Sequence, residues 1–120
     1  MQNPDIHEGY DIIASDKVEG TKVYDPNGEH IGSIERLMLE KRGGHVAYAV
    51  LSFGGFLGIG HDHYPIPWEK LTYDEGVGGY RVDITREQVE GAPKYSGEEY
   101  DWTPQEGRRV YDYYGVQPYW

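Results

Sequence analysis

The sequence predicts a mainly β fold, a small antiparallel β-barrel with a short helix after the last strand and a helical tail. Three observations indicate this fold class. Glycine and proline turn signals recur at short spacing between short apolar segments, as in all-β domains. Residues 46–53 are apolar except for Ser52, which is typical of a strand buried on both faces. Pro65 and Pro67 stand two residues apart in the following segment and mark it as an edge strand. We therefore expect about five or six strands.

The N-terminal part of the chain predicts a flexible leader and two short strands. Residues 1–10 carry neither a basic start nor an apolar core, so they indicate no signal peptide. Strands are expected over Asp11–Ser15 and Thr21–Asp25, where apolar and β-branched side chains stand between turn signals.

The second strand is expected to pair with the next segment as a hairpin. From Asp25 to Gly28 the chain reads Asp-Pro-Asn-Gly, in which proline presets φ and Asn-Gly tolerates positive φ, so a tight turn is predicted. The segment His30–Glu40 supplies the second arm. Its apolar positions change phase at Gly32, which predicts a β-bulge there. Residues 41–44 then turn the chain into the central strand.

The segment Tyr64–Trp68 is the predicted edge strand. Its two prolines lack N–H donors on the same side, so that side cannot donate to a neighbouring strand. Tyr64, Ile66 and Trp68 alternate along the strand, so they share one face and are expected to point into the core together. With two further residues, the predicted core set is Val50, Tyr64, Ile66, Pro67 and Trp68.

The chain after the edge strand predicts one more strand and two helices. Leu71–Asp74 is expected to prolong the edge strand, and Tyr80–Ile84 alternates as a last strand. Thr85 and Gln88 fit a capping box, which predicts a short helix over residues 85–90. Thr103 followed by proline predicts a tail helix over residues 104–114.

Three stretches together resemble the PRC-barrel family: IIASDKVEGTKVYDPNGEHIGSIERLML, HVAYAVLSFGGFLGIG and YPIPWEKL. That family is a small, mainly antiparallel barrel found in the cytoplasmic part of the photosynthetic reaction-centre H subunit, in a ribosome maturation factor and as stand-alone bacterial proteins. The resemblance covers residues 11–93, which leaves an aromatic-rich tail over residues 94–120. It implies a non-catalytic module that docks other proteins, and it offers no catalytic residues.

Composition excludes several functional classes. The 11 Lys and Arg against 21 Asp and Glu give a net charge of −10, which would repel a phosphate backbone, so nucleic acid is not an expected partner. The chain has no cysteine and therefore no disulfide or thiol nucleophile. No segment is apolar over a membrane-spanning length, so we expect a cytoplasmic protein without a membrane span. No spacing of residues matches a catalytic motif, so no enzyme activity and no cofactor are expected.

One cluster supports an alternative function, a divalent-metal-binding protein. His61, Asp62 and His63 are adjacent, and two imidazoles two residues apart in a strand point the same way. A zinc site needs a third protein ligand, for which Glu69, His45 or another subunit are the alternatives. Ordinary surface histidines are the favoured interpretation.

The aromatic content predicts an interaction surface. The chain has 3 Trp, 12 Tyr and 2 Phe, which is more than a small barrel can bury, so some of these rings are expected at a surface between subunits or partners. A homodimer or larger assembly is expected, with the alternative that the tail covers its own barrel. The candidate interaction residues are Phe56, Leu57, Ile59, Tyr113, Tyr114, Tyr119 and Trp120.

Overall fold

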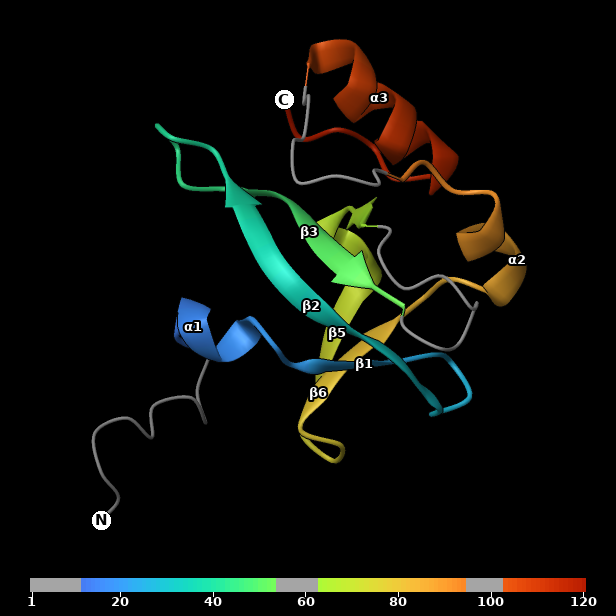
Figure 1. Cartoon of the computed structure of the whole chain (residues 1–120). Helices are drawn as coiled ribbons and strands as arrows, with labels where there is room; N and C mark the ends of the chain where they lie inside the picture. Colours follow the sequence, from blue (N-terminus) through green and yellow to red (C-terminus); the bar gives the residue numbers. More distant parts are fainter. Residues whose placement is uncertain (1–11, 54–62, 95–102) are drawn as a thin grey trace.

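A computed structural model of the chain describes residues 12–53, 63–94 and 103–120. Across these residues one sheet holds its strands in the order β4-β3-β2-β1-β6-β5, which confirms the mainly β fold (Figure 1). The strands are β1 (Lys22–Tyr24), β2 (His30–Leu39), β3 (Val46–Ser52), β4 (Tyr64–Ile66), β5 (Leu71–Asp74) and β6 (Gly79–Val82). The helical elements are α1 (Ser15–Val18), the 3-10 turn η2 (Trp68–Lys70), α2 (Arg86–Glu90) and α3 (Pro104–Tyr113).

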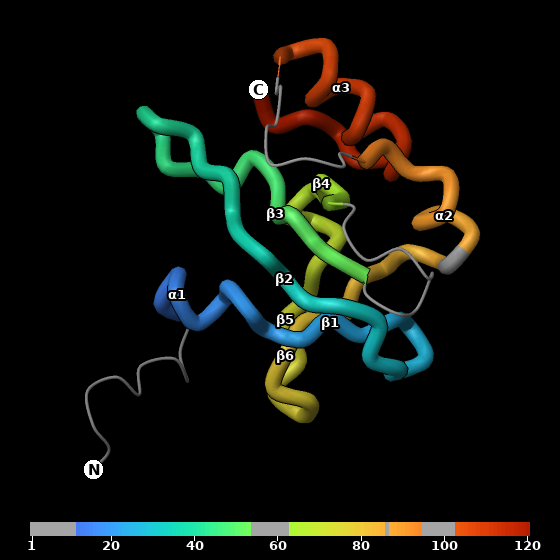
Figure 2. The backbone as a smooth tube through the Cα atoms, viewed as in Figure 1, coloured from blue at the N-terminus to red at the C-terminus, as the bar shows by residue number. Residues whose placement is uncertain are grey.

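Three β-bulges bend this sheet. The register of β1 against β2 shifts at Ile31, and the register of β2 against β3 shifts at Glu35 and again at Ala47. A bulge bends its strand and increases the local twist. The long strand β2 therefore curves, and the sheet curls into a half-barrel (Figure 2).

One pair of strands departs from the predicted antiparallel barrel. β1 and β6 run parallel, whereas the other neighbouring pairs of the sheet are antiparallel. β6 forms an antiparallel hairpin with the edge strand β5 and lies between β5 and β1. In this position it runs parallel to β1. The prediction of an antiparallel sheet is therefore wrong for this pair of strands alone among the pairs that the structure describes.

The predicted hairpin of β1 and β2 is confirmed. The Asp25 carboxylate accepts hydrogen bonds from the backbone N–H of Asn27 at 2.9 Å and of Glu29 at 2.8 Å. Gly28 adopts a φ of 87°, which only glycine reaches without strain. The bulge lies beside Gly32, as its position predicts. A Cβ on Gly32 would lie 2.1 Å from the Ser52 carbonyl oxygen, so the two backbones approach closely there.

Two predicted segments are wrong. Residues 12–14 form no strand, and Ser15 begins the short helix α1, whose Val18 is its buried residue. Ile12 is 70% exposed, so the apolar pair that suggested a strand does not line the core. Leu71–Asp74 does not prolong β4, because η2 separates the two segments and β5 pairs with β6 at the opposite edge of the sheet.

The remaining predicted elements are confirmed. β4 is an edge strand of the sheet. α2 begins with the capping box of Thr85 and Gln88, and α3 begins at Pro104 with Thr103 as its N-cap. The predicted core residues Val50, Tyr64, Ile66 and Pro67 are buried, and Trp68 is half-buried against the core.

The tail helix α3 completes the hydrophobic core. Val110, Tyr111 and Tyr114 belong to the same buried cluster as Tyr64 and Ile66 of β4. In Figure 1, α3 lies over the end of the barrel where β3 and β4 run, with α2 beside it. The tail therefore packs on its own barrel. None of the helices among the described residues is long and apolar enough to cross a membrane.

Candidate interaction pocket

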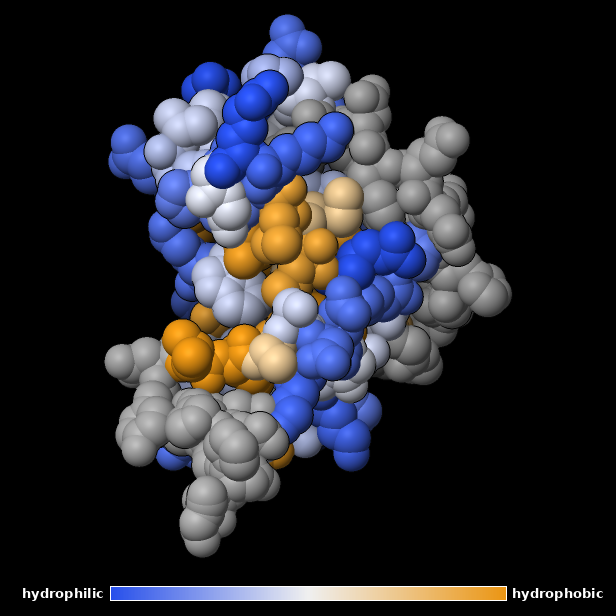
Figure 3. Space-filling view, turned by 90° about the vertical axis from the view of Figure 1, so that its left-hand side faces the viewer, coloured by the Kyte–Doolittle hydropathy of each residue, from blue (hydrophilic) through white to orange (hydrophobic). Residues whose placement is uncertain are grey.

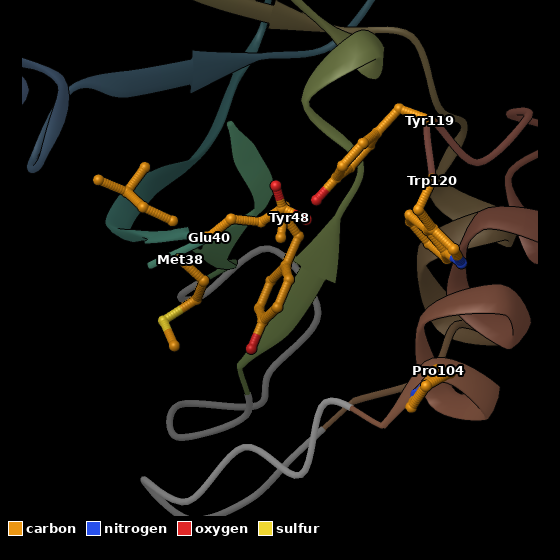
Figure 4. A pocket seen from close by; sticks show the side chains of 8 residues that line it. Met38, Glu40, Tyr48, Pro104, Tyr119 and Trp120 are labelled. Atoms are coloured by element: carbon orange, nitrogen blue, oxygen red, sulfur yellow. The ribbon is translucent and has the colours of Figure 1, made fainter. Parts of the chain in front are cut away.

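A pocket of about 320 Å³ lies between the end of the β2–β3 hairpin and residues 119–120. Figure 4 shows Tyr119 and Trp120 on one side of it and Met38 and Glu40 on the other. The pocket joins parts of the chain that are far apart in sequence. Its lining residues are Met38, Leu39, Glu40, Ala47, Tyr48, Pro104, Tyr119 and Trp120.

A β-bulge fixes the tail to this side of the sheet. Ala47 is the extra residue of the bulge in β3, and a bulge leaves its extra residue unpaired in the ladder. The Tyr111 hydroxyl of α3 donates a 2.7 Å hydrogen bond to the Ala47 carbonyl oxygen. Because Tyr111 is buried, desolvation raises the pKa of its hydroxyl to about 12. The phenol therefore stays a neutral donor throughout the physiological range.

The Tyr111 ring supports the aromatic wall of the pocket. Its centroid lies 5.0 Å from that of Trp120 and 6.3 Å from that of Tyr119, both in edge-to-face geometry. Tyr119 and Trp120 also meet edge to face, with centroids 5.0 Å apart and planes at 87°. Edge-to-face pairs are favourable arrangements of aromatic rings. The two rings are thus positioned by a residue that is itself anchored to β3.

The polar end of the pocket is formed by Glu40. Burial raises the pKa of the Tyr119 hydroxyl, and a hydrogen bond from this hydroxyl to the Glu40 carboxylate raises it further. His45 also contacts this carboxylate. Its Nδ1 lies 3.4 Å from Glu40 Oε1, and its ring centroid lies 5.3 Å from that of Tyr119. Glu40 carries the only charged side chain among the lining residues that the structure describes.

Much of the apolar wall is exposed. Leu39 is 54% exposed, Trp120 46% and Tyr119 39%. On the face that carries the β2–β3 hairpin, hydrophobic residues gather into a patch between hydrophilic ones (Figure 3). Isolated exposed apolar residues are ordinary, but an apolar cluster beside a hollow is typical of interaction sites.

The predicted interaction residues that the structure describes lie in different environments. Tyr119 and Trp120 line the pocket. Tyr114 is buried in the core, and Tyr113 is half-exposed with its hydroxyl donating to the Gln88 carbonyl of α2. Phe56, Leu57 and Ile59 lie outside the described residues.

Of the predicted metal cluster, His63 is described, whereas His61 and Asp62 lie outside the described residues. His63 Nδ1 is 2.6 Å from Glu35 Oε1, and both side chains are half-buried. Glu35 is the extra residue of a β2 bulge, which aims its carboxylate at the end of β4. The histidine nitrogen is thus held by a carboxylate that the sequence does not place near it. No group of three metal-ligating side chains occurs in residues 12–53, 63–94 and 103–120.

A second hollow, of about 480 Å³, lies between the β1–β2 turn and α2. Its acidic rim includes Asp25, whose carboxylate already accepts from two backbone N–H groups of its own turn. Glu29 and Glu87 also line this hollow, so it is more acidic than the pocket at Glu40.

Sequence reasoning missed the β-hairpin side of the pocket. Met38, Leu39, Glu40 and Tyr48 were expected only as strand residues. The one available signal is the run Leu37-Met38-Leu39, because three consecutive apolar residues in a strand place apolar groups on both of its faces. Nothing in the sequence shows that Leu39 extends beyond the end of the core.

The chain was compared with models of protein families. The sequence model of the PRC-barrel domain matches residues 11–89. No curated protein matches the chain.

Proposed function

The chain belongs to the PRC-barrel family, and from that premise we propose that it is a non-catalytic module that docks another protein through the pocket between the β2–β3 hairpin and residues 119–120. The observation that carries this proposal is the exposure of Leu39, Tyr119 and Trp120 around one hollow. Tyr and Trp are enriched at the centres of protein interfaces, where they bury a large area at a small cost in entropy.

The chemistry of the pocket supports docking rather than catalysis. Its walls are apolar and aromatic, and the described lining residues place no serine, threonine, cysteine, lysine or second acidic side chain beside Glu40. General acid–base catalysis needs converging groups with matched pKa values. An apolar hollow with a single polar end is typical of a binding site.

The experiment is affinity capture from the native cell with matched surface variants. Leu39→Asp places a charge at the centre of the exposed patch, whereas Ile12→Asp makes the same exchange at an exposed residue outside the pocket. We expect a partner that the wild type and Ile12→Asp retain and that Leu39→Asp loses. A partner set that is the same for all three proteins would contradict docking through this pocket.

A second copy of the chain is one candidate partner, since the exposed rings that suggest docking also suit self-association. Light scattering of the wild type against Leu39→Asp decides this. A dimer that the variant loses identifies the partner as a second copy; a wild type that is monomeric at all concentrations excludes it.

A further inference from the structure

The pocket combines apolar and aromatic walls with one side-chain carboxylate, that of Glu40, at its polar end. Resting on the proposed docking function, we infer that the pocket receives an arginine side chain of the partner protein, with the guanidinium at Glu40 and the aliphatic stem along the apolar wall. The juxtaposition that carries this inference is Glu40 beside the Tyr119 and Trp120 rings.

The aromatic wall suits a planar cation. Trp120 and Tyr119 stand nearly perpendicular, with planes at 87°, so a group that stacks on one ring face meets the edge of the other. Guanidinium groups stack on aromatic faces, and tryptophan is the strongest partner for such cation–π contacts. Both residues keep a large exposed fraction, so each has surface left for contact with a ligand.

Glu40 supplies the matching charge. Its side chain is 40% exposed, and its contact with His45 Nδ1 is long, at 3.4 Å. A carboxylate has about four acceptor positions, of which His45 and the Tyr119 hydroxyl use two. The remaining positions suit the two parallel N–H donors of a guanidinium.

The rest of the pocket distinguishes arginine from its alternatives. Met38 and Leu39 provide apolar surface for a long aliphatic stem, which an arginine buries while its head stays polar. A lysine ammonium is more strongly hydrated and cannot make the bidentate contact. A purely apolar side chain would desolvate the Glu40 carboxylate without adding a group of opposite charge. The basic residues Lys41 and Arg42 lie in the adjacent turn and are not among the lining residues.

Long-range charge favours the same class of partner. The chain carries a net charge of −10, which attracts basic segments and accelerates their encounter. Within the pocket, the Glu40 carboxylate then attracts one basic side chain to this site.

The test uses blocked tripeptides as probes on the full chain, followed by NMR. The probes are acetyl-Gly-Arg-Gly-amide, its citrulline analogue, in which a neutral urea replaces the guanidinium, and its lysine analogue. We expect shifts at residues 38–40 and at the Trp120 indole, with the arginine probe binding about fivefold tighter than the citrulline probe at low salt. Equal affinity of the arginine and citrulline probes, or of the arginine and lysine probes, would overturn the inference.

Matched variants assign the charge to Glu40. Glu40→Gln should abolish the preference for arginine over citrulline, whereas Glu75→Gln, which removes the same charge from the β5–β6 turn, should preserve it. Trp120→Leu should weaken the binding of all three probes. If Glu75→Gln abolished the preference as fully as Glu40→Gln, the effect would be net charge and the inference would fail.

The two proposals fail in different ways. If a partner depends on Leu39 but the probes bind without regard to Glu40, the arginine inference alone is overturned. If the probes bind as expected but no partner is lost with Leu39→Asp, the preference of the pocket for a guanidinium stands, whereas the docking function, and with it the partner as the source of the arginine, is contradicted.

Discussion

Tyr111 and Ala47 are 64 residues apart in the sequence and are joined by a 2.7 Å hydrogen bond from the tyrosine hydroxyl to the alanine carbonyl oxygen. This bond links the tail helix to the one residue of β3 that a bulge leaves unpaired. The same tyrosine ring packs against both Tyr119 and Trp120. Tyr111 therefore contacts both the barrel, through the Ala47 carbonyl, and the aromatic wall of the pocket.

Replacing Tyr111 by phenylalanine should destabilise the fold. The variant keeps the ring but leaves the Ala47 carbonyl without its partner, and an unsatisfied buried acceptor costs about 1–3 kcal/mol. Urea unfolding measures the loss. Tyr113→Phe is the matched control, since its hydroxyl bonds the Gln88 carbonyl at an exposed position, and it should cost under about 1 kcal/mol. Equal stability of Tyr111→Phe and the wild type would show that the bond contributes nothing.

Gly32→Ala should also destabilise the barrel. An added Cβ would lie 2.1 Å from the Ser52 carbonyl oxygen, which is backbone and cannot rotate away. β2 and β3 would have to separate, at a cost of about 1–3 kcal/mol. Gly43→Ala is the control, because its nearest atoms belong to the side chains of Glu40 and His45. Thermal unfolding should separate the two variants by several degrees, and identical midpoints would contradict the close approach.

The buried tyrosines predict a loss of stability in alkali. The pKa of Tyr111 is raised by burial to about 12, and burial also raises the pKa of Tyr114 far above its usual range. Above the ordinary tyrosine pKa of 10.0 the unfolded chain releases these protons while the folded chain keeps them, so the free energy of unfolding falls as pH rises from 10.0 towards 12. Each such tyrosine contributes a slope of up to about 1.4 kcal/mol per pH unit. Urea unfolding at a series of pH values checks this, and Tyr111→Phe should show a shallower fall. A stability that is constant over this range would refute it.

The metal alternative has a separate test. Since a zinc site needs at least a third protein ligand and no group of three metal-ligating side chains occurs in the described part of the chain, we expect protein purified without a histidine tag to contain no stoichiometric zinc or nickel by elemental analysis. A metal that is present and is lost when both His61 and His63 are replaced would establish the alternative instead.

Much of the fold could be predicted because its signals are local. The Asp25–Gly28 turn, the capping box at Thr85 and the proline at the start of α3 each act within a few residues. The strand wrongly predicted at residues 12–14 also rested on a local signal. Two isoleucines looked like a strand locally, but the tertiary structure leaves Ile12 exposed.

The pocket could be predicted only in part because it depends on distant contacts. The aromatic tail marked Tyr119 and Trp120 as surface rings. The position of these two rings on the barrel depends on the bulge at Ala47 and on the hydrogen bond from Tyr111. A bulge that contains no glycine cannot be recognised from the sequence. Glu35 and His63 meet for the same reason, through a bulge that redirects one side chain.

The most direct measurement of docking is site-specific photo-crosslinking in the native cell. A photoreactive phenylalanine analogue is placed at Leu39 in one protein and at Ile12 in a matched protein, since both residues are exposed and only Leu39 lines the pocket. Docking through the pocket predicts a defined crosslinked product from position 39 that is absent from position 12. The same products from both positions, or none from position 39, would contradict it.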